Sequence, residues 1–198
     1  MNKNLVIALL VLAGGAWYYF RGAGKSEVQS AGVMSAAGVY TDAAAGFSVA
    51  FPAGWKEVPA SHISAANGYS FVLPPEPKAS LVMIPPGPGK AAVLLLPTRR
   101  KPGKMDAFAK RFISAVTAYS KQDLGLEASG PPITELPASP DAPRRLTGYA
   151  KLEDNSLAHF CFFEGRENVF VVYGMAEPGY DTALPAALDA IAASIKRA

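Results

Sequence analysis

Cysteine and histidine are scarce in this sequence, and their scarcity narrows the chemistry that the chain can perform. Cys161 is the single cysteine in 198 residues, so no intrachain disulfide can form and a zinc site built on several cysteines is excluded. His62 and His159 are the two histidines, and no cluster of carboxylates near them completes a zinc site. The motifs Gly-x-Ser-x-Gly and His-Glu-x-x-His are absent. The sequence therefore predicts no metal, no cofactor and no enzymatic activity.

Charge of one sign is also in short supply. The chain has 19 lysines and arginines against 16 acidic residues, a net charge of +3. This excess is too small to indicate a nucleic-acid-binding domain, so we expect no nucleic acid among the partners. In contrast, 50% of the residues are hydrophobic and 10% are aromatic, which excludes a disordered chain. A length of 198 residues fits one domain with an appendage.

The longest uncharged apolar run lies at the amino terminus, from Leu5 to Phe20. Its length of about 16 residues falls between a signal-peptide core and a full membrane span. Trp17, Tyr18 and Tyr19 end the run, where aromatic rings suit the membrane interface, and no convincing cleavage site follows. The alternatives are an uncleaved anchor, a cleaved signal peptide and a helix buried in a complex. We expect residues 1–21 to be an uncleaved transmembrane anchor.

The rest of the chain divides into a tether and one domain. Residues 22–38 are rich in Gly, Ala and Ser and are predicted to be a flexible tether. Residues 39–198 then form the soluble domain. Because long domains cross membranes largely regardless of their charge, we expect this domain on the periplasmic side of a bacterial inner membrane, attached by a single pass.

Alternation of apolar and polar residues predicts a half-buried strand at 47–51. The period changes to three and four residues at 104–121 and 182–196, which predicts two amphipathic helices. A short edge strand is expected within the proline-rich stretch 131–143. Further strands are expected at 69–73, 81–84, 91–96, 145–152, 157–163 and 169–175. This order predicts an α+β fold, in which a central antiparallel sheet is flanked by helices.

Short motifs at both ends of the domain are similar to a known family. The opening combines Tyr40-Thr41-Asp42, Gly46-Phe47-Ser48-Val49 and Pro52-Ala53-Gly54-Trp55. The close combines Phe170-Val171-Val172-Tyr173 with a helix that ends in Ser194-Ile195-Lys196. These features resemble the PsbP-like superfamily, which includes the photosystem II extrinsic subunit P, the Ran-binding import factor and DcrB-like bacterial proteins.

The resemblance covers most of residues 39–198, with Gly46, Phe47, Pro52 and Trp55 as its fold motif. It implies an α-β-α sandwich around a central antiparallel sheet, and a role in binding or assembly rather than catalysis. The proline-rich loops depart from the family pattern. The metal and subunit contacts of the photosynthetic branch match no segment here, so none is carried over.

His159 and Cys161 are the strongest candidates for catalysis. They lie two residues apart in a predicted strand, so both side chains point to one face and could form a thiolate–imidazolium pair. Leu157 and Phe163 share that face, which favours a structural position in the core. Trp55, similarly, is expected to close the core rather than to stack on a ligand.

Arg99, Arg100, Lys101 and Lys104 form the one cluster of like charge. They precede a predicted helix, whose amino terminus disfavours cations, so a solvated loop explains them less well than a binding role does. Anionic lipid headgroups or an acidic partner could dock on them.

Together these features predict a membrane-anchored, non-catalytic binding or assembly protein. It could be an accessory subunit of a membrane complex, with another membrane or periplasmic protein as its partner. The alternatives are a lipid or small-molecule carrier, a protein like the secretion chaperones, and an enzyme that uses Cys161 and His159.

Overall fold

The computed structural model describes residues 32–69, 78–87, 89–124, 133–151 and 155–198, without the side chains of 115–124 and Lys151. Two α-helices stand out in this part of the chain, α2 (Met105–Leu124) and α3 (Leu184–Ser194). Two short 3-10 helices, η1 (Ala60–His62) and η2 (Ala65–Asn67), precede them. The strands are β1 (Val33–Met34), β2 (Val39–Asp42), β3 (Phe47–Ala50), β4 (Lys56–Glu57), β5 (Leu81–Ile84), β6 (Ala91–Pro97), β7 (Thr134–Glu135), β8 (Arg145–Lys151), β9 (Leu157–Glu164), β10 (Val169–Ala176) and β11 (Lys196–Arg197).

A seven-stranded sheet forms the centre of the fold, in the order β4-β5-β6-β10-β9-β8-β7. All of its neighbouring strands run antiparallel. The longest ladders join β10 to β9 and to β6, with Val172 opposite both Cys161 and Leu95. The predicted meander of three strands is therefore confirmed, and β7 supplies the edge strand expected in the proline-rich stretch. Beyond Tyr69, the strand predicted at 69–73 lies outside the described residues.

One face of this sheet packs against α2. Met105, Phe108 and Phe112 of the helix are buried, as the helical spacing predicts, and they meet Phe160 and Phe162 of β9. The rings of Phe112 and Phe160 are 5.1 Å apart in an edge-to-face arrangement, a favourable aromatic geometry. This face is one of two separate apolar layers.

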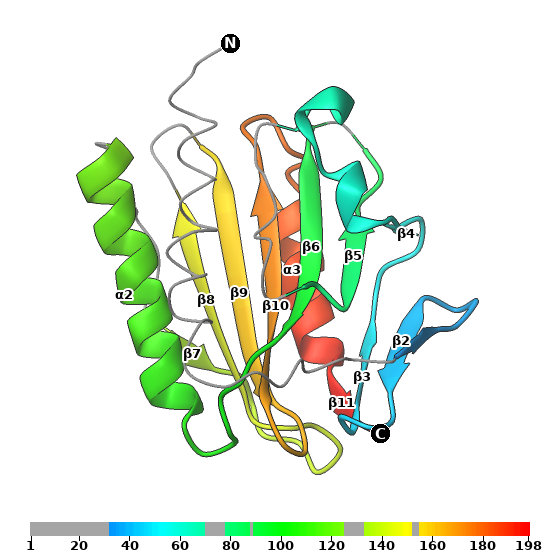
Figure 1. The fold of residues 1–198 in the computed structure, drawn as a ribbon. Helices are drawn as coiled ribbons and strands as arrows, with labels where there is room; N and C mark the ends of the chain where they lie inside the picture. The colour runs from blue at the N-terminus through cyan, green and yellow to red at the C-terminus, as the bar shows by residue number, and fades with distance from the viewer. Residues whose placement is uncertain (1–31, 70–77, 88, 125–132, 152–154) are drawn as a thin grey trace.

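The opposite face packs against α3 and a second, smaller sheet. Leu188 and Ile191 of α3 join Phe163 and Phe170 of the central sheet in the second layer, together with Phe47 of β3. Figure 1 shows strands of the central sheet between α2 and α3, so the predicted antiparallel sheet with flanking helices is confirmed.

Glycines allow both helices to approach the sheet closely. A Cβ atom on Gly174 would come within 2.8 Å of Leu188 on α3, and one on Gly148 within 2.8 Å of Ile113 on α2. At the start of α3, Asp181 accepts a hydrogen bond from the backbone N–H of Ala183, and Pro185 occupies the first turn, as predicted.

The second sheet, in the order β1-β2-β3-β11, differs from the sequence prediction. The strand predicted at 47–51 lies in this sheet and not in the central one. The carboxyl-terminal helix, expected to reach Lys196, ends at Ser194, whose hydroxyl bonds to the backbone of Ala50 and turns the chain into β11. β1 lies inside the stretch 22–38 predicted to be a tether, because Met34 packs on the second apolar layer and pairs with β2.

Among the residues that the structure describes, no helix combines the length and the apolar character needed to cross a bilayer. The predicted anchor, with Trp17, Tyr18 and Tyr19, belongs to residues 1–31 and lies outside this part of the chain. Membrane attachment therefore stays a prediction from the sequence.

Candidate functional site

His159 lies in the centre of β9, beneath α3. It is fully buried, and so is Cys161 two residues further on. Leu157 and Phe163 belong to the same apolar layer as Cys161, which confirms the predicted sharing of one strand face. The strand therefore directs the only candidate nucleophile and the only nearby imidazole, within the described residues, into the layer under α3.

Side chains from β8 and α3 surround the His159 ring. Its Nε2 atom lies 3.0 Å from the Thr147 hydroxyl and 3.7 Å from a carboxylate oxygen of Asp189. The ring of Tyr149 packs against the imidazole, with 4.7 Å between centroids, and the Tyr149 hydroxyl donates a hydrogen bond to Asp189. His159 Nδ1 is buried without a hydrogen-bond partner.

Burial governs the protonation of this cluster. It lowers the pKa of His159 to about 4, although the negative charge of Asp189 acts in the opposite direction. The separation between His159 and Asp189 is within ion-pair range, but a histidine with this pKa is neutral near pH 7. Burial also raises the pKa of the Cys161 thiol to about 12, with Arg145 opposing the shift and Asp189 adding to it. A thiolate–imidazolium pair is therefore disfavoured on both sides.

The arrangement of Thr147, His159 and Asp189 also differs from a catalytic triad. In a triad, the nucleophile and the orienting carboxylate contact opposite nitrogens of the imidazole, so that a proton can be relayed. Here both Thr147 and Asp189 approach Nε2, and Nδ1 contacts neither. The threonine hydroxyl is buried as well. This geometry fits a structural contact that fixes α3 on the sheet.

The basic loop between β6 and α2 presents the opposite picture. Arg99, Arg100, Lys101 and Lys104 are all exposed, as the sequence predicts for a loop. Its backbone is held firmly, because Val169 donates a 2.6 Å hydrogen bond to the Arg100 carbonyl.

The side chains of this loop are arranged for access. The Arg100 guanidinium lies 6.0 Å from the Phe108 ring centroid. Within the described residues, the side chains of Arg99, Lys101 and Lys104 make no hydrogen bond or ion pair. The loop thus offers cations in a defined position.

Further cations lie beside this loop, although they are distant in the sequence. The turn between β9 and β10 contacts the loop through a 2.7 Å hydrogen bond from Gly103 N–H to Glu164, and it carries Arg166. Arg166 N–H bonds to the carbonyl of Ala45 in the β2–β3 turn, and Ala198 N–H bonds to Gly46. We call this surface the basic end; its cations are Arg99, Arg100, Lys101, Lys104, Arg166, Lys196 and Arg197.

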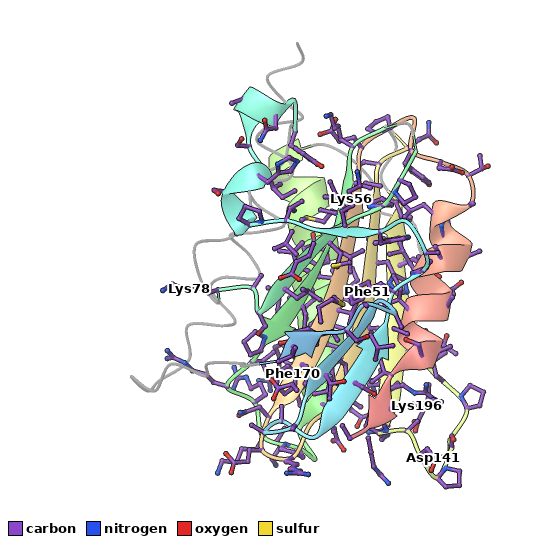
Figure 2. All side chains as sticks on the ribbon, turned by 90° about the vertical axis from the view of Figure 1, so that its right-hand side faces the viewer. Phe51, Lys56, Lys78, Asp141, Phe170 and Lys196 are labelled. Carbon is purple, nitrogen blue, oxygen red and sulfur yellow. The ribbon has the colours of Figure 1, made fainter. Side chains whose placement is uncertain are left out.

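The basic end also carries the acidic residues Glu164, Glu167 and Asp141, which its cations outnumber. Figure 1 shows the loops that form it at the lower end of the molecule, and Figure 2 shows Lys196 there beside Asp141. Sequence analysis found the loop but missed Arg166 and β11, because only the pairing of β11 with β3 brings the chain end there.

A third polar arrangement, also missed, lies on the surface near the start of α2. Arg144 forms ion pairs with Asp106 of α2 and with Glu135 of β7, the latter with 2.8 Å between charged atoms. Hydrogen bonding to Arg144 is the main reason that the pKa values of Asp106 and Glu135 lie below their usual range. All three side chains are at least a third exposed, so this network ties elements together weakly.

The fold-motif residues lie around the second sheet. Gly46 has a φ of 77° in the turn where Asp42 accepts a hydrogen bond from Ala45, and Phe47 is fully buried against Phe163 and Phe170.

The remaining candidates are scattered. Pro52 and Trp55 follow β3 and are partly buried, with the Trp55 ring 6.2 Å from Phe51. His62 lies apart in η1, next to Tyr69. No group of three or more His, Cys, Asp or Glu residues in the described ranges is arranged to hold a metal ion.

No protein-family model matches the sequence, and no curated protein matches it. Among solved structures, the fold is similar to the solution structure of cyanobacterial PsbP (CyanoP) from Synechocystis sp. PCC 6803, with a TM-score of 0.54 and 15% sequence identity. The match covers 87% of this chain and 100% of that one. The resemblance predicted from the opening and closing motifs is thereby confirmed at the level of structure: the chain has a PsbP-like fold.

Proposed function

We propose that this protein is a non-catalytic binding or assembly protein, held at a bacterial inner membrane by residues 1–21. Its PsbP-like domain faces the periplasm and acts as an accessory subunit of a membrane complex. The observation that carries this proposal is the contrast between the two candidate sites. The groups with catalytic potential, His159 and Cys161, are sealed beneath α3, whereas the cations of the basic end are exposed on a fixed backbone.

Two further observations support a binding role. The PsbP-like fold is one in which the family resemblance implies binding or assembly. The basic loop is also an unusual neighbour for the start of α2, because a helix amino terminus disfavours positive charge. Exposed charges contribute little to stability, so a role for these cations is better sought in contacts with another molecule.

The amino-terminal segment supports attachment to the membrane. Leu5–Phe20 contains no charge, and Trp17, Tyr18 and Tyr19 at its end suit the interface. An arginine near the middle of such a segment disfavours insertion by about 3 kcal/mol. A paired substitution there should therefore release the protein, while the domain beyond residue 32 stays unchanged.

The experiment is fractionation of cells that produce the full chain. We expect the protein in the membrane pellet, resistant to high salt and to alkaline carbonate, and accessible to protease added to spheroplasts. The double variant Leu9→Arg/Leu10→Arg should move to the soluble fraction. Release of the unaltered chain by salt alone would contradict anchoring, and protection from protease would contradict the periplasmic location.

The binding role is tested by purification in mild detergent. A partner should be recovered with the full chain in stoichiometric amount, and its recovery should fall when Lys101 and Lys104 are changed to Glu. The matched control is Lys56→Glu/Lys78→Glu, which makes the same change in net charge away from the basic end, as Figure 2 shows. Recovery of the chain alone under all conditions would contradict a role as an accessory subunit.

A further inference from the structure

The point where the chain enters the domain lies beside the basic end. β1 pairs with β2 so that Val33 is opposite Thr41, next to Asp42. Asp42 opens the β2–β3 turn, whose Ala45 and Gly46 bond to the β9–β10 turn and to the chain end. Residues that precede Gly32 therefore join the fold at the end that carries the exposed cations, and not at the opposite end with η1 and η2 (Figure 1).

Covalent geometry limits how far this end can be from a membrane. If residues 1–21 span the bilayer, the segment 22–31 is the only link to Gly32. A fully extended chain covers at most about 3.5 Å per residue, so this link spans at most about 35 Å. The basic end is thus the part of the domain whose distance from the bilayer is most restricted.

We propose that the basic end is a docking surface for the anionic headgroups of the bilayer that holds residues 1–21. This inference rests on the proposed membrane anchoring. The cations occur in two groups on either side of the chain entry. Arg99, Lys101 and Lys104 lie on the β6–α2 loop, whereas Lys196 and Arg197 lie on β11 of the small sheet.

The tether gives this docking its effect. A single lysine or arginine near an anionic membrane strengthens association about fivefold. A covalent link raises the local concentration of the surface, so several such weak contacts suffice to orient the domain. Because the interaction is between exposed charges, it should weaken with salt, as the Debye length falls to about 8 Å at physiological ionic strength.

The test uses the full chain in nanodiscs and measures energy transfer to dye-labelled lipid headgroups. One donor is placed at Ala44→Cys in the β2–β3 turn, and a reference donor at Ala66→Cys in η2, at the other end of the molecule. Both positions are exposed, and the native Cys161 is buried and should not react. Nanodiscs of phosphatidylcholine alone are compared with nanodiscs that also contain phosphatidylglycerol.

We expect transfer from position 44 to exceed transfer from position 66, and to rise when phosphatidylglycerol is present. The rise should disappear at high salt and in the variant Lys101→Glu/Lys104→Glu. The control Lys56→Glu/Lys78→Glu should keep it, which excludes a general effect of net charge.

The outcomes separate this inference from the proposed function. Failure of the chain to enter nanodiscs would contradict anchoring itself. Entry into nanodiscs with equal transfer in both lipids would overturn the docking inference alone. Equal transfer, together with loss of a co-purified protein in Lys101→Glu/Lys104→Glu, would instead assign the basic end to an acidic protein partner.

Discussion

His159 and Thr147 form a polar contact inside an otherwise apolar layer. A buried polar group without a full set of hydrogen bonds is costly, and His159 Nδ1 has no partner. The residue is tolerated because Thr147 satisfies Nε2 and because the ring stays uncharged. Asp189 and Tyr149 form the outer rim of this contact, where the carboxylate remains exposed.

The protonation of His159 predicts a dependence of stability on pH. The unfolded chain binds a proton at this residue with a pKa of about 6.5, and the folded chain with a pKa of about 4. The unfolded state therefore binds more protons between these values, and folding loses roughly 3 kcal/mol as the pH falls from 6.5 to 4. Urea unfolding as a function of pH measures this loss.

The variant His159→Gln should flatten the pH dependence in that window, relative to the unaltered protein. His62→Gln is the matched control, since His62 belongs to neither buried layer, and it should keep the original slope. A slope that persists in His159→Gln would show that other groups carry it.

Cys161 is expected to be a structural residue. It is fully buried, and its thiol pKa of about 12 leaves almost no thiolate near pH 7. We predict that Cys161→Ala costs about 1 kcal/mol of stability without loss of partner binding. A polar thiol reagent should label the protein only in denaturant; rapid labelling of the native protein would place the thiol at a site open to solvent.

The sequence revealed part of this cluster. Alternation in 157–163 placed His159 and Cys161 on one face, but their contacts came from elsewhere in the chain. The turn between β8 and β9 contained a signal that could have been used, since Lys151 opposite Leu157 brings Tyr149 opposite His159. The contribution of Asp189 required knowledge of where α3 docks.

At the scale of elements, α3 is held at its carboxyl end by a buried arginine. Arg145 begins β8 and is 6% exposed. Its guanidinium donates hydrogen bonds to the carbonyls of Ala193 at 2.8 Å and Pro137 at 2.9 Å. A cation at this position also complements the negative end of the helix dipole. One side chain thus joins the sheet, α3 and the proline-rich loop.

Neighbouring arginines allow a matched test of this role. Arg145→Met leaves the carbonyls of Ala193 and Pro137 without their buried donor and should cost about 3 kcal/mol. Arg144→Met removes only surface ion pairs with Asp106 and Glu135 and should cost less than about 1 kcal/mol. Urea unfolding of both variants measures the difference. Equal costs would show that Arg145 does not fix α3.

Long, periodic elements were predictable from the sequence, and short ones were not. The helices and the strands β5, β6, β8, β9 and β10 have runs of apolar residues long enough to show a period. The two-residue strands β1, β4 and β11 have none, and their existence depends on partners far away in the chain. This is why the separate small sheet was missed and why β3 was assigned to the central sheet.

On the scale of the whole molecule, the two apolar layers and the basic end have different roles. The layers on either side of the central sheet hold α2, α3 and the small sheet in place. The basic end draws on four segments of the chain that only the fold brings together. Sequence analysis identified its first segment, Arg99 to Lys104, from local charge alone. Arg166 and β11 became part of it through the β9–β10 turn and the small sheet.

The most direct test of the account is the mass of the protein extracted from membranes. Anchoring requires that residues 1–21 remain attached to the domain. Intact-mass measurement of the membrane-extracted protein should therefore give about 20.7 kDa, the mass of the whole chain. A protein that begins beyond Phe20, recovered in the soluble fraction, would contradict a membrane-anchored accessory subunit and leave a secreted PsbP-like domain.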